Sequence, residues 1–133
     1  ACAAGERTGL YYTCINSYLL ADELAYILNN SESKLVITSR SKKEVALQAL
    51  KQCPNVRLCL VVDGDPADTR HPDLATAVAA FPATPVADES LGTPMLYSSG
   101  TTGRPKGILR PLPENPPSEP LPLYKFLDQL WRY

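Results

Sequence analysis

The segment LYSSGTTGRPKG, from Leu96 to Gly107, gathers residue types that suit the binding of a phosphate. Seven of its twelve residues are Gly, Ser or Thr, and its one lysine, Lys106, follows Pro105. Glycines let the backbone approach a ligand closely, and consecutive N–H groups in such a loop can form an anion-binding nest. Hydroxyls add further donors, and Lys106 adds a positive charge. The spacing therefore predicts a phosphate-binding loop.

This loop differs from the two commonest nucleotide-binding signatures. A Walker A loop places its lysine directly after a glycine and continues into a helix, whereas here Pro105 precedes Lys106 and the next residues have strand character. The glycine spacing of a Rossmann fingerprint is absent as well. The simplest alternative is a flexible Ser/Thr/Gly connector, but an ordinary linker does not need Pro-Lys-Gly at this spacing.

The stretch YSSGTTGRPKG closely resembles the phosphate-binding signature of adenylate-forming enzymes, the AMP-binding superfamily that includes acyl-CoA synthetases and fatty-acid–CoA ligases. Ten of the eleven signature positions fit, and Ser98 stands where threonine is usual. An earlier stretch, 8–39, is similar to a family segment that contains Glu-Leu-x-Tyr-Ile-Leu. The extension GILRPLPENPP resembles acyl-CoA synthetases more than the adenylation domains of peptide synthetases. The resemblance thus covers nearly the whole chain.

The resemblance implies a two-step reaction that uses ATP, Mg²⁺ and coenzyme A. A carboxylate, expected to be that of a fatty acid, attacks the α-phosphate of Mg-ATP to give an acyl-adenylate and pyrophosphate. The thiol of coenzyme A then attacks the acyl carbon and AMP leaves. By the same resemblance Lys106 is the catalytic cation, and the Ser98 hydroxyl helps to bind Mg²⁺. The residues expected to hold the phosphates are Ser98, Ser99, Gly100, Thr101, Thr102, Gly103, Lys106 and Gly107.

Other parts of the family pattern do not occur in the 133 residues. The later Tyr-Gly-x-Thr-Glu segment, the aspartate for the ribose and the C-terminal lysine domain are absent. The chain also begins without Met and stops within a helical pattern, so we expect an internal fragment that is inactive alone. Its expected partners are the acid, ATP, coenzyme A and the rest of its own polypeptide. Two alternatives stay open: a truncated remnant or weak phosphate-binding module, and an adenylating enzyme whose acceptor is a carrier-protein thiol.

The segments that must position the loop predict an α/β fold class, a partial N-terminal domain with parallel βαβ units and a strand–glycine loop–strand phosphate clamp. Alternating or continuous apolar runs predict strands, and a period of 3.6 predicts helices. The unbroken apolar strands are typical of a sheet that is covered on both faces. Strands are expected at 10–15, 35–38, 56–62, 94–97 and 108–109, and helices at 22–30, 41–52, 73–81 and 123–133. The helix after position 40 should begin with a capping box formed by Ser41 and Glu44.

We expect residues 1–133 to form part of one large AMP-binding domain. In this division 1–92 is the βαβ portion, 93–110 the phosphate-binding hairpin, 111–122 a connector and 123–133 the start of a helix. The connector holds six of the thirteen prolines, which is typical of a polyproline II linker.

Composition narrows the class of protein further. A formal net charge of −1 provides no general attraction to nucleic acid, and no apolar run approaches the roughly 20 residues that span a bilayer. The four cysteines form no C-x-x-C pair and His71 has no cysteine nearby, so we expect no zinc site. Cys59 lies in an apolar strand pattern and should be a core residue. A reducing, cytoplasmic location is expected.

Overall fold

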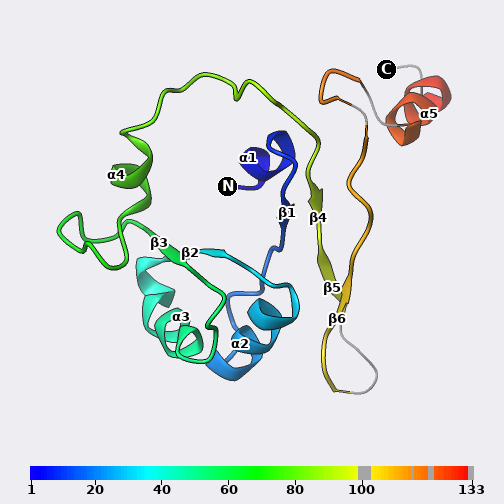
Figure 1. The fold of residues 1–133 in the computed structure, drawn as a ribbon. Helices are drawn as coiled ribbons and strands as arrows, with labels where there is room; N and C mark the ends of the chain where they lie inside the picture. The colour runs from blue at the N-terminus through cyan, green and yellow to red at the C-terminus, as the bar shows by residue number, and fades with distance from the viewer. Residues whose placement is uncertain (99–102, 115, 120–121, 132–133) are drawn as a thin grey trace. The chain divides into compact units, whose positions relative to one another are not determined.

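The computed structural model describes residues 1–98, 103–114, 116–119 and 122–131 (Figure 1). The chain divides into two compact units. One comprises Ala1–Tyr12, Thr84–Met95 and Leu109–Tyr133, and the other Thr13–Ala83 and Leu96–Ile108. The described strands form three two-stranded sheets, each within one unit. Helices and both parallel and antiparallel strand pairs are present, so the α/β fold class is confirmed.

A parallel pair of strands lies at the centre of the second unit. β2 (Leu35–Ser39) pairs with β3 (Leu58–Val62), residue for residue along the whole length of both strands. Helix α3 (Lys43–Leu50) connects them, preceded by a 3₁₀ turn, η1 (Arg40–Lys42). Parallel strands need a crossover of this kind, because their equivalent ends lie at the same edge. This part of the predicted βαβ arrangement is confirmed.

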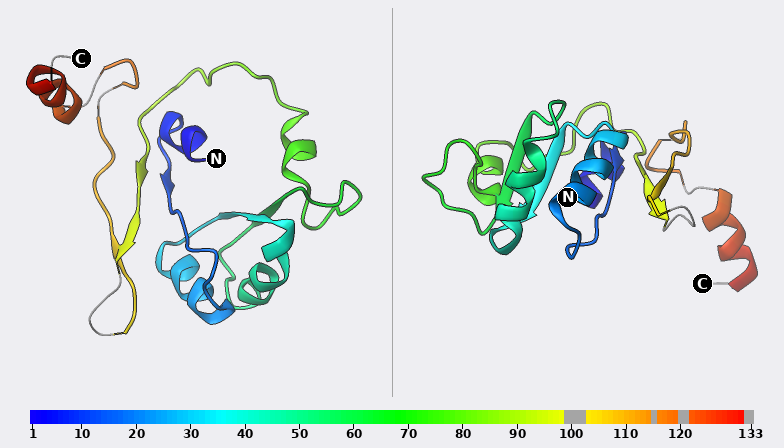
Figure 2. Two further views of the ribbon diagram at one scale, coloured as in Figure 1. Left: turned by 180° about the vertical axis from the view of Figure 1, so that it is seen from behind. Right: turned by 90° about the horizontal axis from the view of Figure 1, so that it is seen from below.

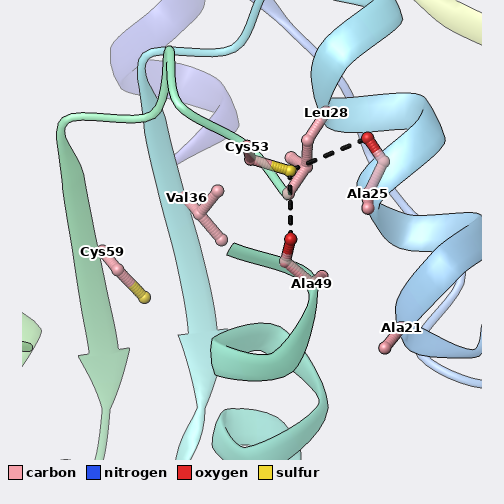
Figure 3. Packing of buried hydrophobic residues seen from close by; sticks show 7 residues of the cluster. All are labelled: Ala21, Ala25, Leu28, Val36, Ala49, Cys53 and Cys59. Atoms are coloured by element: carbon pink, nitrogen blue, oxygen red, sulfur yellow. Dashed lines mark hydrogen bonds between the residues drawn. The ribbon is translucent and has the colours of Figure 1, made fainter. Parts of the chain in front are cut away.

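Small side chains let α2 (Ala21–Asn30) and α3 pack closely on one face of the β2–β3 pair (Figures 1 and 2). The core cluster consists of Ala21, Ala25, Leu28, Val36, Ala49, Cys53 and Cys59. The Cys53 thiol lies 3.3 Å from the Ala49 carbonyl oxygen and 3.7 Å from that of Ala25, and donates to both (Figure 3). Cys53 therefore joins α2 to the end of α3. Cys59 is a core residue, as predicted, and burial raises the pKa of both thiols.

The opposite face of the β2–β3 pair is largely exposed in the described structure. Successive side chains of a strand point to opposite faces, so this face carries the residues that alternate with the buried Val36 and Cys59. Its apolar members Leu35, Ile37, Leu58 and Val62 are exposed, whereas Leu60 on the same face is buried. The described residues therefore cover this face only around Leu60, and the prediction that both faces are covered is corrected to that extent.

The first predicted strand is shorter than expected and pairs elsewhere. Only β1 (Tyr11–Tyr12) forms within 10–15, and it pairs in parallel with β4 (Thr93–Pro94) in the first unit, not with β2. The reason is the close approach of the chain around Gly92, whose N–H donates to the Glu6 carbonyl oxygen at 3.0 Å. A Cβ at Gly92 would lie 2.1 Å from the Gly5 carbonyl oxygen, so only glycine fits.

Two predicted helix boundaries are also corrected. The capping box at Ser41 is wrong, because Ser41 lies in η1 and its hydroxyl pairs with that of Ser39 at 3.0 Å. Helix α4 (Leu74–Val78) is shorter than the predicted 73–81. Asp73 caps it by accepting from the Thr76 N–H at 2.9 Å, but α4 buries none of its residues and so gains little from packing.

Two further helices lie in the first unit. Helix α1 (Cys2–Arg7) was not expected from the sequence, and an ion pair joins its Arg7 to Glu89. Helix α5 (Pro122–Trp131) agrees with the predicted helix after the proline-rich connector, and its apolar stripe is exposed. In the described part of the chain, no helix combines the length and the apolar character needed to cross a membrane.

A network around Asp68 joins α3 to the loop that follows β3. The Lys43 ammonium donates to Asp68 Oδ2 at 2.7 Å, and the backbone N–H groups of Arg70 and His71 donate to Oδ1 at 2.9 and 3.0 Å. The Lys43 hydrogen bond is the main cause that holds the pKa of this carboxyl well below its usual range. Burial opposes this effect but is outweighed.

This network predicts acid sensitivity. Because the folded-state pKa of Asp68 is depressed, its contribution to stability is present above the unfolded pKa of about 4 and is lost as pH falls toward the folded value. Asp68→Asn should flatten the decline in unfolding free energy between about pH 4 and pH 2, measured by urea titration. Asp88→Asn, at an exposed carboxylate, is the matched control. Identical acid profiles for Asp68→Asn and the unsubstituted chain would contradict the assignment.

Candidate functional site

The predicted phosphate clamp is an antiparallel hairpin in the second unit (Figure 1). β5 (Leu96–Ser98) pairs with β6 (Lys106–Ile108). The expected strand–loop–strand order is therefore confirmed, but both boundaries are corrected. The strand expected at 94–97 is divided between β4 and β5, and the strand expected at 108–109 begins earlier, at Lys106, because Lys106 and Gly107 pair with β5.

The register of the hairpin places Ser98 directly opposite Lys106. Side chains of a directly opposed pair lie on the same face of a sheet, with Cβ atoms about 5 Å apart. Both residues are exposed, while Tyr97, opposite Gly107, points to the other face and is partly buried. One face of the hairpin thus presents a hydroxyl and an ammonium group together at the two ends of the glycine loop.

Four of the eight predicted phosphate-binding residues belong to the described structure: Ser98, Gly103, Lys106 and Gly107. Gly103 has φ of +86°, a conformation that glycine adopts without strain, and nothing lies within 4 Å of the position of a Cβ there. The other four, Ser99, Gly100, Thr101 and Thr102, lie outside the described residues. Within the described part, Lys106 forms no ion pair, so its charge is available to a ligand.

Contacts with α2 hold the other face of the hairpin. The Tyr97 hydroxyl donates to Asn30 Oδ1 at 2.7 Å, and the Tyr26 hydroxyl donates to the Pro105 carbonyl oxygen at 3.2 Å. The Arg104 guanidinium lies over the Tyr26 ring, 5.4 Å from its centroid. The sequence alone assigned no role at the site to Tyr26 or Asn30. Tyr26 belongs to the earlier Glu-Leu-x-Tyr-Ile-Leu segment, and its four-residue spacing from Asn30 places both on one face of a helix.

The donor set suits an anion better than a metal ion alone. The described face offers one hydroxyl and one ammonium, and no group of three or more His, Cys, Asp or Glu among the described residues could hold a metal. Mg²⁺ in phosphate-transfer sites is usually held by few protein oxygens together with substrate phosphates. The Ser98 hydroxyl therefore fits Mg²⁺ only as one ligand of an ion that arrives with phosphate.

Comparison with known proteins indicates the same family as the sequence of the glycine loop. The family model described as "AMP-binding enzyme" matches residues 1–112. The 4-hydroxybenzoate–CoA/benzoate–CoA ligase of Rhodopseudomonas palustris is 34% identical over 108 residues, which cover 77% of this chain and 19% of that protein. The acetyl-coenzyme A synthetase of Novosphingobium aromaticivorans is 35% identical over 126 residues, which cover 82% and 19%. The chain thus spans about a fifth of the length of these relatives.

A solved structure supports the fold. The anthranilate CoA ligase AuaEII, in complex with anthranoyl-AMP, superimposes with a TM-score of 0.64 at 26% identity. The alignment covers 72% of this chain and 19% of that one. The described elements therefore correspond to part of a larger α/β enzyme fold.

The environment of Tyr97 predicts a pH-dependent loss of stability. Burial raises the pKa of Tyr97 above its usual value of about 10, and the nearby Tyr26 raises it further. A hydrogen bond with Ser31 has the opposite, smaller effect on this pKa. The folded state therefore retains the phenolic proton. Its contribution to stability is present below about pH 10 and is lost as pH rises through the folded pKa. Subtracting the ultraviolet titration of Tyr97→Phe should isolate a tyrosine that ionises above pH 10. A difference curve centred at or below pH 10 would contradict this prediction.

Proposed function

Because the chain belongs to the AMP-binding enzyme family, we propose that it supplies the phosphate-binding hairpin of an ATP-dependent acid–thiol ligase. The observation that carries the proposal is the pairing of Ser98 with Lys106 on one exposed face, at the two ends of the glycine loop. The named relatives that attach acids to coenzyme A support the same reaction class.

The proposed reaction has two steps. The oxygen of a carboxylate attacks the α-phosphorus of ATP, the bond to the bridging oxygen breaks, and pyrophosphate leaves. The thiol of coenzyme A then loses its proton and attacks the acyl carbon, and AMP carries away the bonding electron pair. We propose a fatty or related acyl acid as substrate. Because the relatives are named for benzoate, acetate and crotonobetaine or carnitine, a substrate panel must include aromatic and short acids.

The chain's own residues would act by positioning and electrostatics. The Lys106 ammonium would neutralise charge that accumulates on the departing pyrophosphate, and the Ser98 hydroxyl would contact a phosphate oxygen or its Mg²⁺. Gly103 and Gly107 would let the backbone N–H groups approach the phosphates, together with residues 99–102. In this proposal residues 93–110 contain the phosphate-binding element, 1–92 its scaffold, and 111–133 the connector and the start of the following helix.

Replacing Lys106 tests the proposal in the full-length protein that contains this chain. Lys106→Ala should slow acyl-adenylate formation about 100-fold, the usual effect of removing one group that stabilises developing charge. The rate of thioester formation from a supplied acyl-adenylate should change much less, since pyrophosphate has already left. Rapid-quench measurement of both half-reactions checks the prediction, with Lys51→Ala at an exposed lysine as the control. Equal losses in both half-reactions would argue against this role.

A second candidate is a phosphate-binding module without catalytic activity. It is favoured by the donors that the described site presents, a hydroxyl and an ammonium group, which suit an anion. The isolated 133 residues should then bind pyrophosphate but show no exchange of labelled pyrophosphate into ATP with any acid. Turnover in that assay would assign catalysis to the chain itself. A carrier-protein thiol as acceptor is the other alternative, and competition between coenzyme A and a carrier protein in the full-length protein decides it.

A further inference from the structure

We propose that Tyr26 on α2 is a positioning residue for Lys106, a role that rests on the proposed phosphate-binding function. Tyr26 is 80 positions before Lys106, outside the phosphate-binding signature, and it is the tyrosine of the earlier Glu-Leu-x-Tyr-Ile-Leu segment. It acts together with Asn30, and these two residues form the α2 anchor.

The α2 anchor occupies one face of α2. Residues four apart on a helix lie one above the other, so Tyr26 and Asn30 form a pair that faces the hairpin. Tyr26 bonds to the Pro105 carbonyl oxygen in the arm that leads into β6, and Asn30 bonds to Tyr97 in β5. Each strand of the hairpin is therefore tied to the same helix face.

The bond to Pro105 acts directly on Lys106. A peptide unit is planar, so the plane that contains the Pro105 carbonyl group ends at the Lys106 Cα. Orienting that carbonyl group orients the backbone from which the lysine side chain extends. Proline has a fixed φ, so the ψ rotation of Pro105 is the main remaining backbone freedom that sets the direction of this carbonyl group, and the hydrogen bond from Tyr26 restrains it.

The cation next to Lys106 is held by the same tyrosine. The Arg104 guanidinium lies 5.4 Å from the Tyr26 ring centroid, a cation–π distance. Arg104 is thus engaged with α2, while Lys106, two residues later, points to the exposed face with Ser98. The contact with the Tyr26 ring therefore holds Arg104 against α2 and leaves Lys106 to contact the ligand. The raised pKa of Tyr97 agrees with a partly desolvated contact between the hairpin and α2.

Cleavage by trypsin measures how often the hairpin opens near Lys106. Trypsin cuts after lysine but not at the Arg104–Pro105 bond, so Lys106 is the cleavage site within this part of the hairpin. The Lys106–Gly107 bond lies inside the β5–β6 ladder, so it is cut when the hairpin opens, and the rate of cutting reports the open population. In the full 133-residue chain, Tyr26→Phe keeps the ring and removes the hydroxyl. It should raise cleavage at Lys106 about fivefold, the usual effect of one hydrogen bond. Cleavage after the exposed Lys51 should not change.

Three further variants complete the design. Asn30→Ala should raise cleavage at Lys106 to a similar extent, which provides an independent test. Tyr26→Leu should raise it further, because the contact with Arg104 is lost as well. Tyr18→Phe is the matched control, since Tyr18 is an exposed tyrosine of the same unit whose ring faces Lys42. Its cleavage pattern should equal that of the unsubstituted chain.

The outcomes separate the positioning role from the proposed function. Inorganic pyrophosphate should slow cleavage at Lys106 in the unsubstituted chain, and Tyr26→Phe should require about fivefold more pyrophosphate for the same protection. A selective rise at Lys106 with no protection in any variant would support the anchor and overturn phosphate binding by this chain. An unchanged rate at Lys106 in both Tyr26→Phe and Asn30→Ala, or an equal rise at Lys51, would overturn the positioning role.

Discussion

The close packing of α2 on α3 is the constraint on which the candidate site depends. Ala25 on α2 and Ala49 on α3 are small enough for the helices to approach, and Cys53 bonds to the carbonyl groups of both. Another face of α2 carries Tyr26 and Asn30, which hold the hairpin. One ten-residue helix therefore belongs to both the hydrophobic core and the support of the glycine loop. A change that rotates α2 in the core would also move the residues that support the hairpin.

Local patterns predicted the centre of the second unit well. The apolar runs at β2 and β3 and the periodicity of α2 are signals that a few neighbouring residues create, and the structure confirms each element. The failures concern contacts between distant residues. Tyr11 and Tyr12 have the composition of a strand, but their partner is fixed by the approach of Gly92 to Gly5, which periodicity cannot reveal.

In the candidate site, too, the features made by neighbouring residues were predicted, and the contacts between distant residues were not. The glycines, the hydroxyls and Lys106 form a continuous motif, so the sequence was sufficient to locate the loop and to predict a strand on either side of it, although not where those strands begin and end. Tyr26 could not be assigned, because a tyrosine on an amphipathic helix is ordinarily a packing residue. Its role depends on which face of α2 remains after Ala21, Ala25 and Leu28 enter the core. The pairing of Ser98 with Lys106 likewise follows from the strand register and not from their distance in the sequence.

The contact between Arg104 and Tyr26 has an evolutionary consequence. In the phosphate-binding signature that the loop resembles, Y/F-T-S-G-S/T-T-G-x-P-K-G, Arg104 occupies the position marked x, where the signature specifies no residue. In this chain its guanidinium lies on a ring that is 78 positions earlier, so a substitution at position 104 changes a contact with α2 as well as the loop. A loop transplanted here from a relative would keep this contact only if it carried a side chain at position 104 that can lie on the Tyr26 ring. Exchange of such loops between relatives is therefore constrained by a helix that the signature does not include.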